Sequence, residues 1–489
     1  MRKSFLKGAL ILSLAPIVTQ LFSFVILPFI TRMYDPEDFG VYSSIVSVAG
    51  VLSVLQGLGY HQAIVLPKSD SIAKLIYNTC LIITILLSAL YLLVFLLIPD
   101  YFIEIYIPQA ILDFKYSILM LILLHGLYSC LSMMNIRKGN YKIIAISRVL
   151  RVIVTKSTII SLGLFMFVSH SNLIYADIFA SVAVSLVLIY GTKNIYFNQK
   201  YSAKLIQKVL YKYRQFPVYN LPADVVFRLK QAVVVVLILK YFGSEVVGYY
   251  AMALLILSIP TTIIGSAIGE VLYKESAEYG SNGELEKIVL ETLTIMLSVS
   301  LIIFLSLAVF SDRIVPLLLG DNWSEASSVI SILVIICFGD FVIGPFLNIL
   351  KVLNRQKFIL IYQTLVLLSS IFSIWIGSKL DGYIYSFWFY SVTNFFIAIS
   401  LLVLILRISV IEFKSLNELS RIVLHIIPSI LLFLLYDNYN ANIPIYYDIL
   451  LIFIAVFVNY YFNYKYISVF KVLSDYLVVD PMNKLCRRK

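Results

Sequence analysis

The seventh long apolar stretch of the chain, residues 217–239, carries polar and charged side chains along one helical face. An ionisable side chain at the centre of a bilayer is costly unless it faces a cavity or a partner. Arg228 lies about 16 Å along such a helix at 1.5 Å per residue, and Lys230 lies at the edge of the same face. Asp224 is near enough to neutralise Arg228, whereas Lys230 has no local carboxylate. The face, at positions i, i+4, i+8 and i+11, consists of Asn220, Asp224, Arg228 and Gln231.

The fifth apolar stretch, residues 143–168, contributes three more cations. Arg148 is close enough to one end of the helix to extend to the headgroups. Lys156 lies roughly 20 Å along the helix and cannot easily reach either surface, while Arg151 is intermediate. The stretches together hold more cations than deep carboxylates. The sequence therefore predicts a cavity that binds an anionic substrate, such as a phosphate or an acidic sugar.

Other residues of the apolar stretches have a structural interpretation beside a functional one. Asp340, like Asp224, is either a charge partner or an ion- or proton-coupling site. His125 falls in the middle of the fourth stretch, where we expect a packed, hydrogen-bonded histidine, with a proton relay as the alternative. Pro217 and Pro222 free backbone groups and predict a bent or broken entry to the seventh helix.

The sequence lacks the motifs of common catalytic and metal-binding sites. It contains no phosphate-binding loop of the GxxxxGK type, no HExxH, no CxxC and no cluster of Cys and His. The longest loops expected on the outer side, 99–113 and 311–328, are too short to hold an extracytoplasmic catalytic site. We therefore expect a protein that is not an enzyme and that has no cofactor or metal.

The composition places these residues in a polytopic membrane protein. Of 489 residues, 61% are hydrophobic and 13% are charged, whereas soluble domains are about half apolar and a quarter charged. A helix needs about 20 apolar residues to cross the hydrocarbon layer. On that scale we expect an all-α polytopic membrane protein with about fourteen transmembrane helices, at 8–30, 41–66, 75–98, 114–136, 143–168, 173–192, 217–239, 246–269, 288–310, 329–350, 358–378, 383–406, 422–436 and 445–463.

The positions of Lys and Arg orient these helices. If the N-terminus is cytoplasmic, the inside segments hold 28 Lys and Arg and the outside segments hold 5. Cationic loops are retained in the cytoplasm during insertion, so we expect both termini to be cytoplasmic. The formal net charge of +11 is then mostly a signal of topology, and nucleic acid is not an expected partner.

Two pairs of similar segments indicate an internal repeat. Residues 31–42 and 239–250 match at a constant offset of 208, which aligns Gly40 with Gly248, and 138–142 resembles 354–357. We expect two parallel-repeat six-helix bundles, with chance similarity between short polar turns as the alternative. The expected parts are the N-terminal bundle 1–192, a cytoplasmic amphipathic linker 193–216, the C-terminal bundle 217–406, two additional transmembrane helices within 407–463 and a basic cytoplasmic tail 464–489.

The linker carries a lysine on every fourth residue. Like charges at this spacing destabilise a helix in water, so anionic membrane lipids are the expected partner. The linker either lies on the membrane surface or recruits an anionic lipid-linked substrate. The lysines are Lys200, Lys204, Lys208 and Lys212.

Several short motifs follow one another in a fixed order. They are Lys7-Gly8-Ala9, Phe29-Ile30-Thr31-Arg32, Asp35-Pro36-Glu37-Asp38-Phe39-Gly40-Val41-Tyr42, Gly57-Leu58-Gly59, Val247-Gly248-Tyr249-Tyr250 and Val315-Pro316-Leu317-Leu318-Leu319-Gly320-Asp321-Asn322-Trp323. In type, order and place they resemble the Wzx-like oligosaccharide flippases of the multidrug/oligosaccharidyl-lipid/polysaccharide exporter superfamily. The resemblance covers nearly the whole chain.

This resemblance implies two bundles around a central cleft that alternates in access. It implies that polyprenyl-pyrophosphate-linked oligosaccharide, of the O-antigen or capsule type, moves to the outer leaflet of the bacterial inner membrane. A polysaccharide polymerase and chain-length machinery are further candidate partners. Arg228 and Lys230 fit a cationic cleft, whereas Gln20, which aligns with Arg228 at the offset of 208, is neutral. That departure gives more weight to Lys156 and Arg151.

Two other functions stay open at this point. A cation-coupled exporter of drugs or metabolites shares the superfamily scaffold, although its cleft should be acidic and aromatic. A membrane enzyme of polysaccharide assembly is the second alternative.

Overall fold

The computed structural model describes residues 3–99, 101, 104, 108–193, 202–279, 285–353, 355–380 and 382–408. The regular structure in these ranges is helical throughout, which confirms the all-α fold class. Nine of the described helices are long and apolar enough to cross a membrane. The expected helices at 422–436 and 445–463, the tail 464–489 and Lys200 lie outside the described residues.

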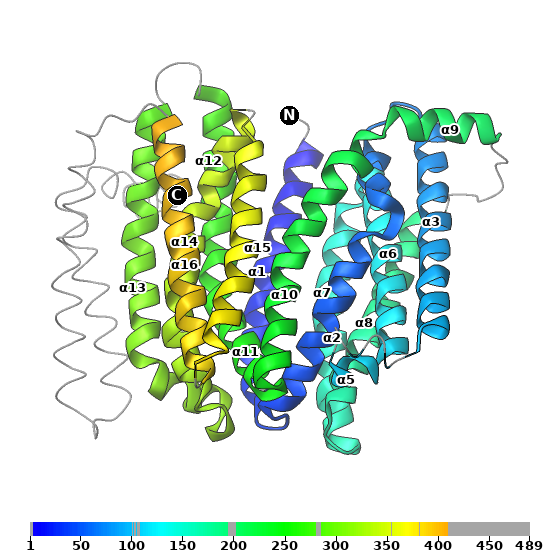
Figure 1. Ribbon diagram of the computed structural model, residues 1–489. Coiled ribbons are helices and arrows are strands. Elements are labelled where there is room, and N and C mark those ends of the chain that lie inside the picture. The colour runs from blue at the N-terminus through cyan, green and yellow to red at the C-terminus, as the bar shows by residue number, and fades with distance from the viewer. Residues whose placement is uncertain are drawn as a thin grey trace, which may run out of the picture. The chain divides into compact units, whose positions relative to one another are not determined.

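The chain forms two compact units, which we treat separately. The first contains Met1–Met252, Leu318–Glu325 and Gln363–Ser386, and the second contains Ala253–Leu317, Ala326–Tyr362 and the described residues from Phe387. The first twelve predicted stretches fall on helical elements, and 41–66, 217–239 and 246–269 each cover more than one of them (Figure 1). The helices are α1 (Lys3–Thr31), α2 (Pro36–Val54), η1 (Gln56–Val65), α3 (Asp70–Leu97), α5 (Gln109–Leu112), α6 (Lys115–Arg137), α7 (Tyr141–Phe165), α8 (His170–Thr192), α9 (Ala203–Lys212), η2 (Phe216–Asn220), α10 (Leu221–Phe242), α11 (Ser244–Pro260), η3 (Thr261–Gly265), α12 (Ser266–Tyr279), α13 (Leu285–Leu319), η4 (Asp321–Trp323), α14 (Ala326–Val352), α15 (Lys357–Gly377) and α16 (Tyr383–Ile408).

The second predicted helix, 41–66, is interrupted in the structure. Its α-helical part ends at Val54, and Gly57, Leu58 and Gly59 adopt φ values of 66°, 47° and 75°. Left-handed backbone is open to glycine but costs a residue such as leucine about 1–2 kcal/mol. The expectation of one continuous helix was therefore wrong, and the two glycines are the local reason for the break.

The entry to the seventh helix is also irregular, as the two prolines predicted. Phe216–Asn220 forms a π-helical turn before α10 begins. This turn packs against the break in the second helix, because a Cβ atom at Gly59 would lie 3.3 Å from the carbonyl oxygen of Phe216. Tyr60 Oη also donates to the carbonyl oxygen of Leu210, at 3.2 Å.

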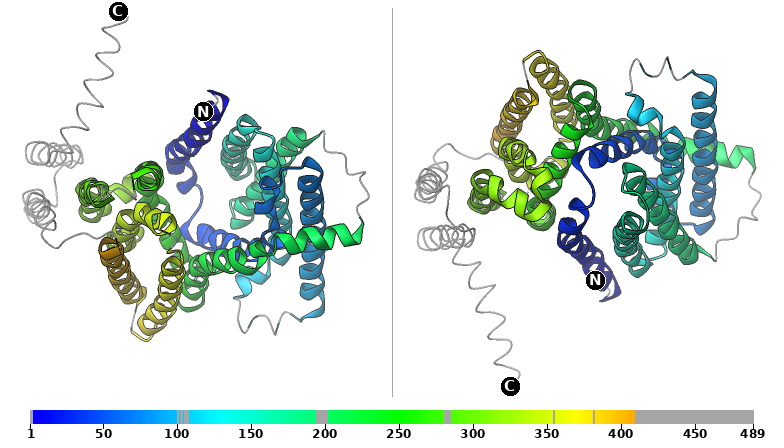
Figure 2. Two further views of the ribbon diagram at one scale, coloured as in Figure 1. Left: turned by 90° about the horizontal axis from the view of Figure 1, so that it is seen from above. Right: turned by 90° about the horizontal axis from the view of Figure 1, so that it is seen from below.

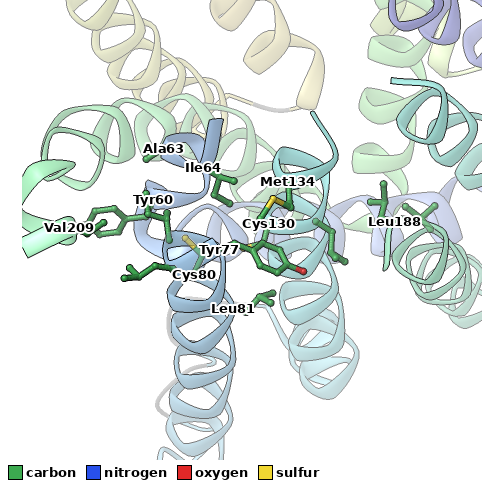
Figure 3. Packing of buried hydrophobic residues seen from close by; sticks show 14 residues of the cluster. Tyr60, Ala63, Ile64, Tyr77, Cys80, Leu81, Cys130, Met134, Leu188 and Val209 are labelled. Carbon is green, nitrogen blue, oxygen red and sulfur yellow. The ribbon is translucent and has the colours of Figure 1, made fainter. Parts of the chain in front are cut away.

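The linker helix α9 lies crosswise to α3 and packs against it (Figures 1 and 2). Ser202 caps its first turn by accepting a hydrogen bond from the Leu205 amide. Val209 is its buried residue and enters an apolar cluster with side chains of η1, α3 and α6, whereas Lys204, Lys208 and Lys212 are exposed. Figure 3 labels Tyr60, Ala63, Ile64, Tyr77, Cys80, Leu81, Cys130, Met134, Leu188 and Val209 of this cluster.

The two repeat-related turns of the first unit lead into a close helix crossing. The helix α2 begins at Pro36 and α11 begins at Ser244, 208 residues later. A Cβ atom at Gly40 would overlap the carbonyl oxygen of Ser244, and one at Gly248 would overlap the carbonyl oxygen of Pro36. The contact is reciprocal, so the offset of 208 has a structural counterpart at this crossing.

Hydrogen bonds join η4 to the first of these turns. Trp323 is fully buried, and its Nε1 donates to the carbonyl oxygen of Thr31 at 3.0 Å. Asn322 Nδ2 donates to Asp35 Oδ1 at 2.8 Å. Burial raises the pKa of Tyr34 above its usual value, so its phenol stays protonated and donates to the carbonyl oxygen of Ile159.

The second unit is built around α14, most of which is buried. Phe304 of α13 makes edge-to-face contacts with Phe338 and Phe341 of α14, with ring centroids 6.3 and 5.6 Å apart. Asn348 Nδ2 donates to the carbonyl oxygen of Gly269, which ties α14 to α12.

Candidate functional site

The polar face of α10 lies just beyond the π-helical turn, and the side chains of Asp224, Arg228 and Gln231 are exposed. Among the residues that the structure describes, Arg228 forms neither a hydrogen bond nor an ion pair. Asp224 therefore does not neutralise it. A guanidinium without a carboxylate partner favours an anionic ligand, and its planar fork matches the oxygens of a phosphate group.

Asp224 is instead held by a glutamine of η1. Gln62 Nε2 donates to Asp224 Oδ2 at 3.0 Å, and Asn220 Nδ2 donates to Gln62 Oε1 at 3.0 Å. The side chain of Gln62 thus links Asn220, at the end of the π-helical turn, to Asp224 in the first turn of α10. The sequence interpretation did not select Gln62, although an amide side chain inside the apolar stretch 41–66 is a usable signal.

Arg151 lies in a polar cluster formed by three helices. Its Nη2 is 3.0 Å from Asp177 Oδ1 of α8 and 3.1 Å from His125 Nε2 of α6. Asp177 is 6% exposed at its side chain and Arg151 is 31% exposed. Because arginine only donates, His125 Nε2 accepts, and a neutral ring carries its proton on Nδ1. The histidine is hydrogen-bonded, as expected, and Asp177 neutralises much of the charge of Arg151.

This cluster lies near the polar face of α10. Arg228 is close enough to His125 to influence its ring electrostatically, and Asp177 and Arg151 influence the phenol of Tyr42 of α2 in the same way. Five helices of the first unit therefore contribute charged or titratable groups to one region.

The remaining predicted residues differ in their surroundings. Lys156 is half-buried on α7 and has no polar partner within the described part of the chain. Lys230 Nζ lies 5.5 Å from the centroid of the Phe227 ring, a cation–π contact. Gln20 on α1 and Gln231 form no side-chain hydrogen bond with described residues. Of the four cations predicted for the site, Arg228, Lys230 and Lys156 thus have no carboxylate partner among the described residues, whereas Arg151 has one.

Asp340 belongs to the second unit, as does the tyrosine that donates to it. Its Oδ1 accepts a hydrogen bond from Tyr362 Oη at 3.2 Å. Across the described ranges, no three His, Cys, Asp or Glu side chains gather closely enough to hold a metal ion.

Comparisons with known proteins place this geometry in context. A family model described as "Polysaccharide biosynthesis protein" matches residues 29–328. The teichuronic acid biosynthesis protein TuaB of Bacillus subtilis (strain 168) is 23% identical over 243 residues, which are 48% of this chain and 50% of that protein. The match thus spans about half of the length of that relative.

Two solved structures share the fold. The lipid II flippase MurJ, in an inward closed conformation, matches with a TM-score of 0.73 at 14% identity, over 92% of this chain and 98% of that one. An inward-facing multidrug resistance transporter of the MATE family gives a TM-score of 0.61 at 12% identity, over 83% and 99% of the two chains. The chain therefore shares the fold of these two membrane proteins.

Proposed function

The chain belongs to the polysaccharide biosynthesis protein family, and on this basis we propose that it is a flippase for polyprenyl-pyrophosphate-linked oligosaccharide. The substrate, an O-antigen or capsule-type repeat unit, moves from the cytoplasmic to the outer leaflet by alternating access. The proposal depends above all on three cations expected at membrane depth, Arg228, Lys230 and Lys156, which have no carboxylate partner among the described residues.

In this proposal the cations bind the pyrophosphate. Arg228 takes two phosphate oxygens through its guanidinium fork, and Lys230 and Lys156 offset the remaining negative charge. Arg151, which Asp177 already holds, contributes to the field of the site more than to direct binding. These groups replace the hydration of the pyrophosphate while the head group crosses the apolar layer.

The amide side chains of the site suit the sugars. Asn220, Gln231 and Gln20 each offer both a donor and an acceptor to hydroxyl groups. Asp224 and Asp340 are the candidate charge partners or coupling groups, and Gln62 keeps Asp224 at the entry to α10.

The charge distribution and the family support the membrane topology that we propose. With 28 Lys and Arg in one set of loops and 5 in the other, the α9 end of the first unit is cytoplasmic, as are both termini. The membrane is the bacterial inner membrane. Residues 1–192 and 217–406 form the two repeat bundles of the transporter, with anionic lipids under the linker and polymerase and chain-length proteins as further partners.

The proposal is tested by complementation in a strain that depends on this chain for surface polysaccharide. Arg228→Ala should leave the amount of protein in the membrane unchanged and abolish surface polysaccharide, because the pyrophosphate loses its main ligand. Arg407→Ala is the matched control, since Arg407 is an exposed arginine in the last turn of α16. Normal polysaccharide with Arg228→Ala, or transport of an organic cation by the purified protein, would contradict the proposal.

A further inference from the structure

A pocket of about 210 Å³ lies between α2 and α10 of the first unit. Every side chain that lines it is apolar. Most of these residues are half-buried, and Ala232 is buried, so the pocket opens at the surface of the helix pair. The lining residues are Val48, Val51, Leu52, Leu229, Ala232, Val233, Val236 and Leu237.

The pocket lining on α10 begins at the residue after Arg228, a cation that has no partner among the described residues. Leu229 follows Arg228 directly in the sequence, and Ala232 lies one turn further along the same side of α10. The apolar stripe that lines the pocket therefore runs beside the polar face that carries Asp224 and Arg228. An exposed arginine one residue from the lining of an apolar pocket on the same helix is complementary to an amphiphile whose anionic group is attached directly to hydrocarbon.

We propose that this pocket binds the first isoprene units of the carrier lipid, those attached to the pyrophosphate. The inference rests on the proposed function and adds a binding site for a part of the substrate. An apolar cavity of about 150 Å³ holds a benzene molecule, which has six carbons. A pocket of 210 Å³ thus has room for about one to two five-carbon isoprene units. The rest of the polyprenyl chain stays in the bilayer.

The pocket gives the site a way to select its substrate. Nucleotide sugars in the cytoplasm also carry a pyrophosphate, so cations alone do not distinguish them from the lipid-linked substrate. A nucleotide sugar has no hydrocarbon to place between α2 and α10, whereas a polyprenyl pyrophosphate gains from burying its first isoprene units there. The pocket and Arg228 together recognise the junction between pyrophosphate and lipid.

The test is a binding series with the purified full chain. The probes are inorganic pyrophosphate, dimethylallyl pyrophosphate, geranyl pyrophosphate and farnesyl pyrophosphate, which add one isoprene unit at a time. Affinity should rise at least about 10-fold from inorganic to geranyl pyrophosphate, a modest part of the gain expected for burying ten carbons. It should rise little from geranyl to farnesyl, because the pocket is then full. Native mass spectrometry or calorimetry measures the series.

Variants that fill the pocket separate its role from that of the cation. Ala232→Phe should remove the gain from the prenyl chain and leave the affinity for inorganic pyrophosphate within about 2-fold. Val51→Phe fills the pocket from α2 and serves if Ala232→Phe does not fold. Leu86→Phe is the control, because Leu86 is 63% exposed on α3 and does not line the pocket. Arg228→Gln should weaken binding of every probe.

The possible failures point to different parts of the account. If pyrophosphate binds but prenyl units add nothing, or if the filled pocket binds geranyl pyrophosphate as tightly as before, the pocket proposal is overturned and the flippase proposal stands. Equal competition by phosphatidylglycerol assigns the pocket to bilayer lipid and also overturns it. If no pyrophosphate probe binds, or if Arg228→Gln has no effect, the proposed function itself is overturned.

Discussion

Two arginines of the first unit show how neighbours decide what a charge does. Arg151 is paired with the buried Asp177 at 3.0 Å and also donates to His125. Arg228, which lies on α10, has no such partner among the described residues. An ion pair of the first kind holds helices α7 and α8 together, whereas an unpaired guanidinium of the second kind is available to a ligand.

The ion pair between Arg151 and Asp177 should contribute more to the free energy of unfolding than an exposed pair of the same residue types. Asp177→Asn keeps an acceptor near Arg151 but leaves its charge without compensation. Removing one partner of a buried pair costs about 3–5 kcal/mol, and partial exposure of Arg151 reduces our expectation to roughly 2–3 kcal/mol. The measurement is the thermal unfolding of the purified variant.

A second pair provides the control for this prediction. Asp70 and Arg137 are 2.7 Å apart, but Asp70 is 85% exposed. Asp70→Asn should therefore change the unfolding temperature little or not at all, because water screens exposed pairs. Equal destabilisation by the two substitutions would show that burial of Asp177 does not matter.

At the scale of residues, the sequence was informative where spacing is local. The i, i+4 and i+8 pattern predicts one helical face for Asn220, Asp224 and Arg228. In the structure Asp224 and Arg228 lie on α10 and Asn220 ends the π-helical turn before it. The partners of these residues could not be obtained in the same way. Gln62 reaches Asp224 across 162 residues, and such a contact depends on how helices pack and not on any local pattern.

At the scale of elements, the crossing of α2 and α11 depends on two glycines. Gly40→Ala places a Cβ atom on the carbonyl oxygen of Ser244, so the two backbones must separate. Overpacking of this kind costs about 1–3 kcal/mol. Thermal unfolding should therefore show a clear loss of stability for Gly40→Ala, and Gly248→Ala should behave alike because the contact is reciprocal.

Another glycine of the same helix is the matched control. A Cβ atom at Gly50 meets nothing within 4 Å, so Gly50→Ala should be neutral or stabilising by about 0.5–1 kcal/mol through helix propensity. A variant of Gly40 as stable as the variant of Gly50 would argue against the close crossing.

The irregular elements could be predicted only where a residue type, such as proline, restricts the backbone and removes a helical hydrogen bond. Pro217 and Pro222 require a distorted entry to the seventh helix, and a π-helical turn is present there. The break at residues 57–59 was missed because Leu58, a residue that rarely adopts a positive φ, gives no sign of its conformation. Glycines in an apolar stretch are compatible with both a continuous and a broken helix.

At the scale of the whole molecule, composition and charge predicted a polytopic helical membrane protein without any motif. The orientation that they imply can be measured by cysteine labelling from each side. In a background that lacks the natural cysteines, Gln207→Cys on α9 should react with an impermeant maleimide only after the inner face is exposed. Asp113→Cys, in an exposed turn before α6, should react in intact cells. The opposite labelling would invert the proposed topology.

The central claim is that this chain moves a lipid-linked oligosaccharide between leaflets with Arg228 in the binding site. The most direct measurement is the leaflet in which the polyprenyl-pyrophosphate oligosaccharide resides after the gene is deleted. The account predicts accumulation on the cytoplasmic side, reversed by the natural chain and by Arg407→Ala but not by Arg228→Ala. An unchanged distribution after deletion, or full restoration by Arg228→Ala, would contradict it.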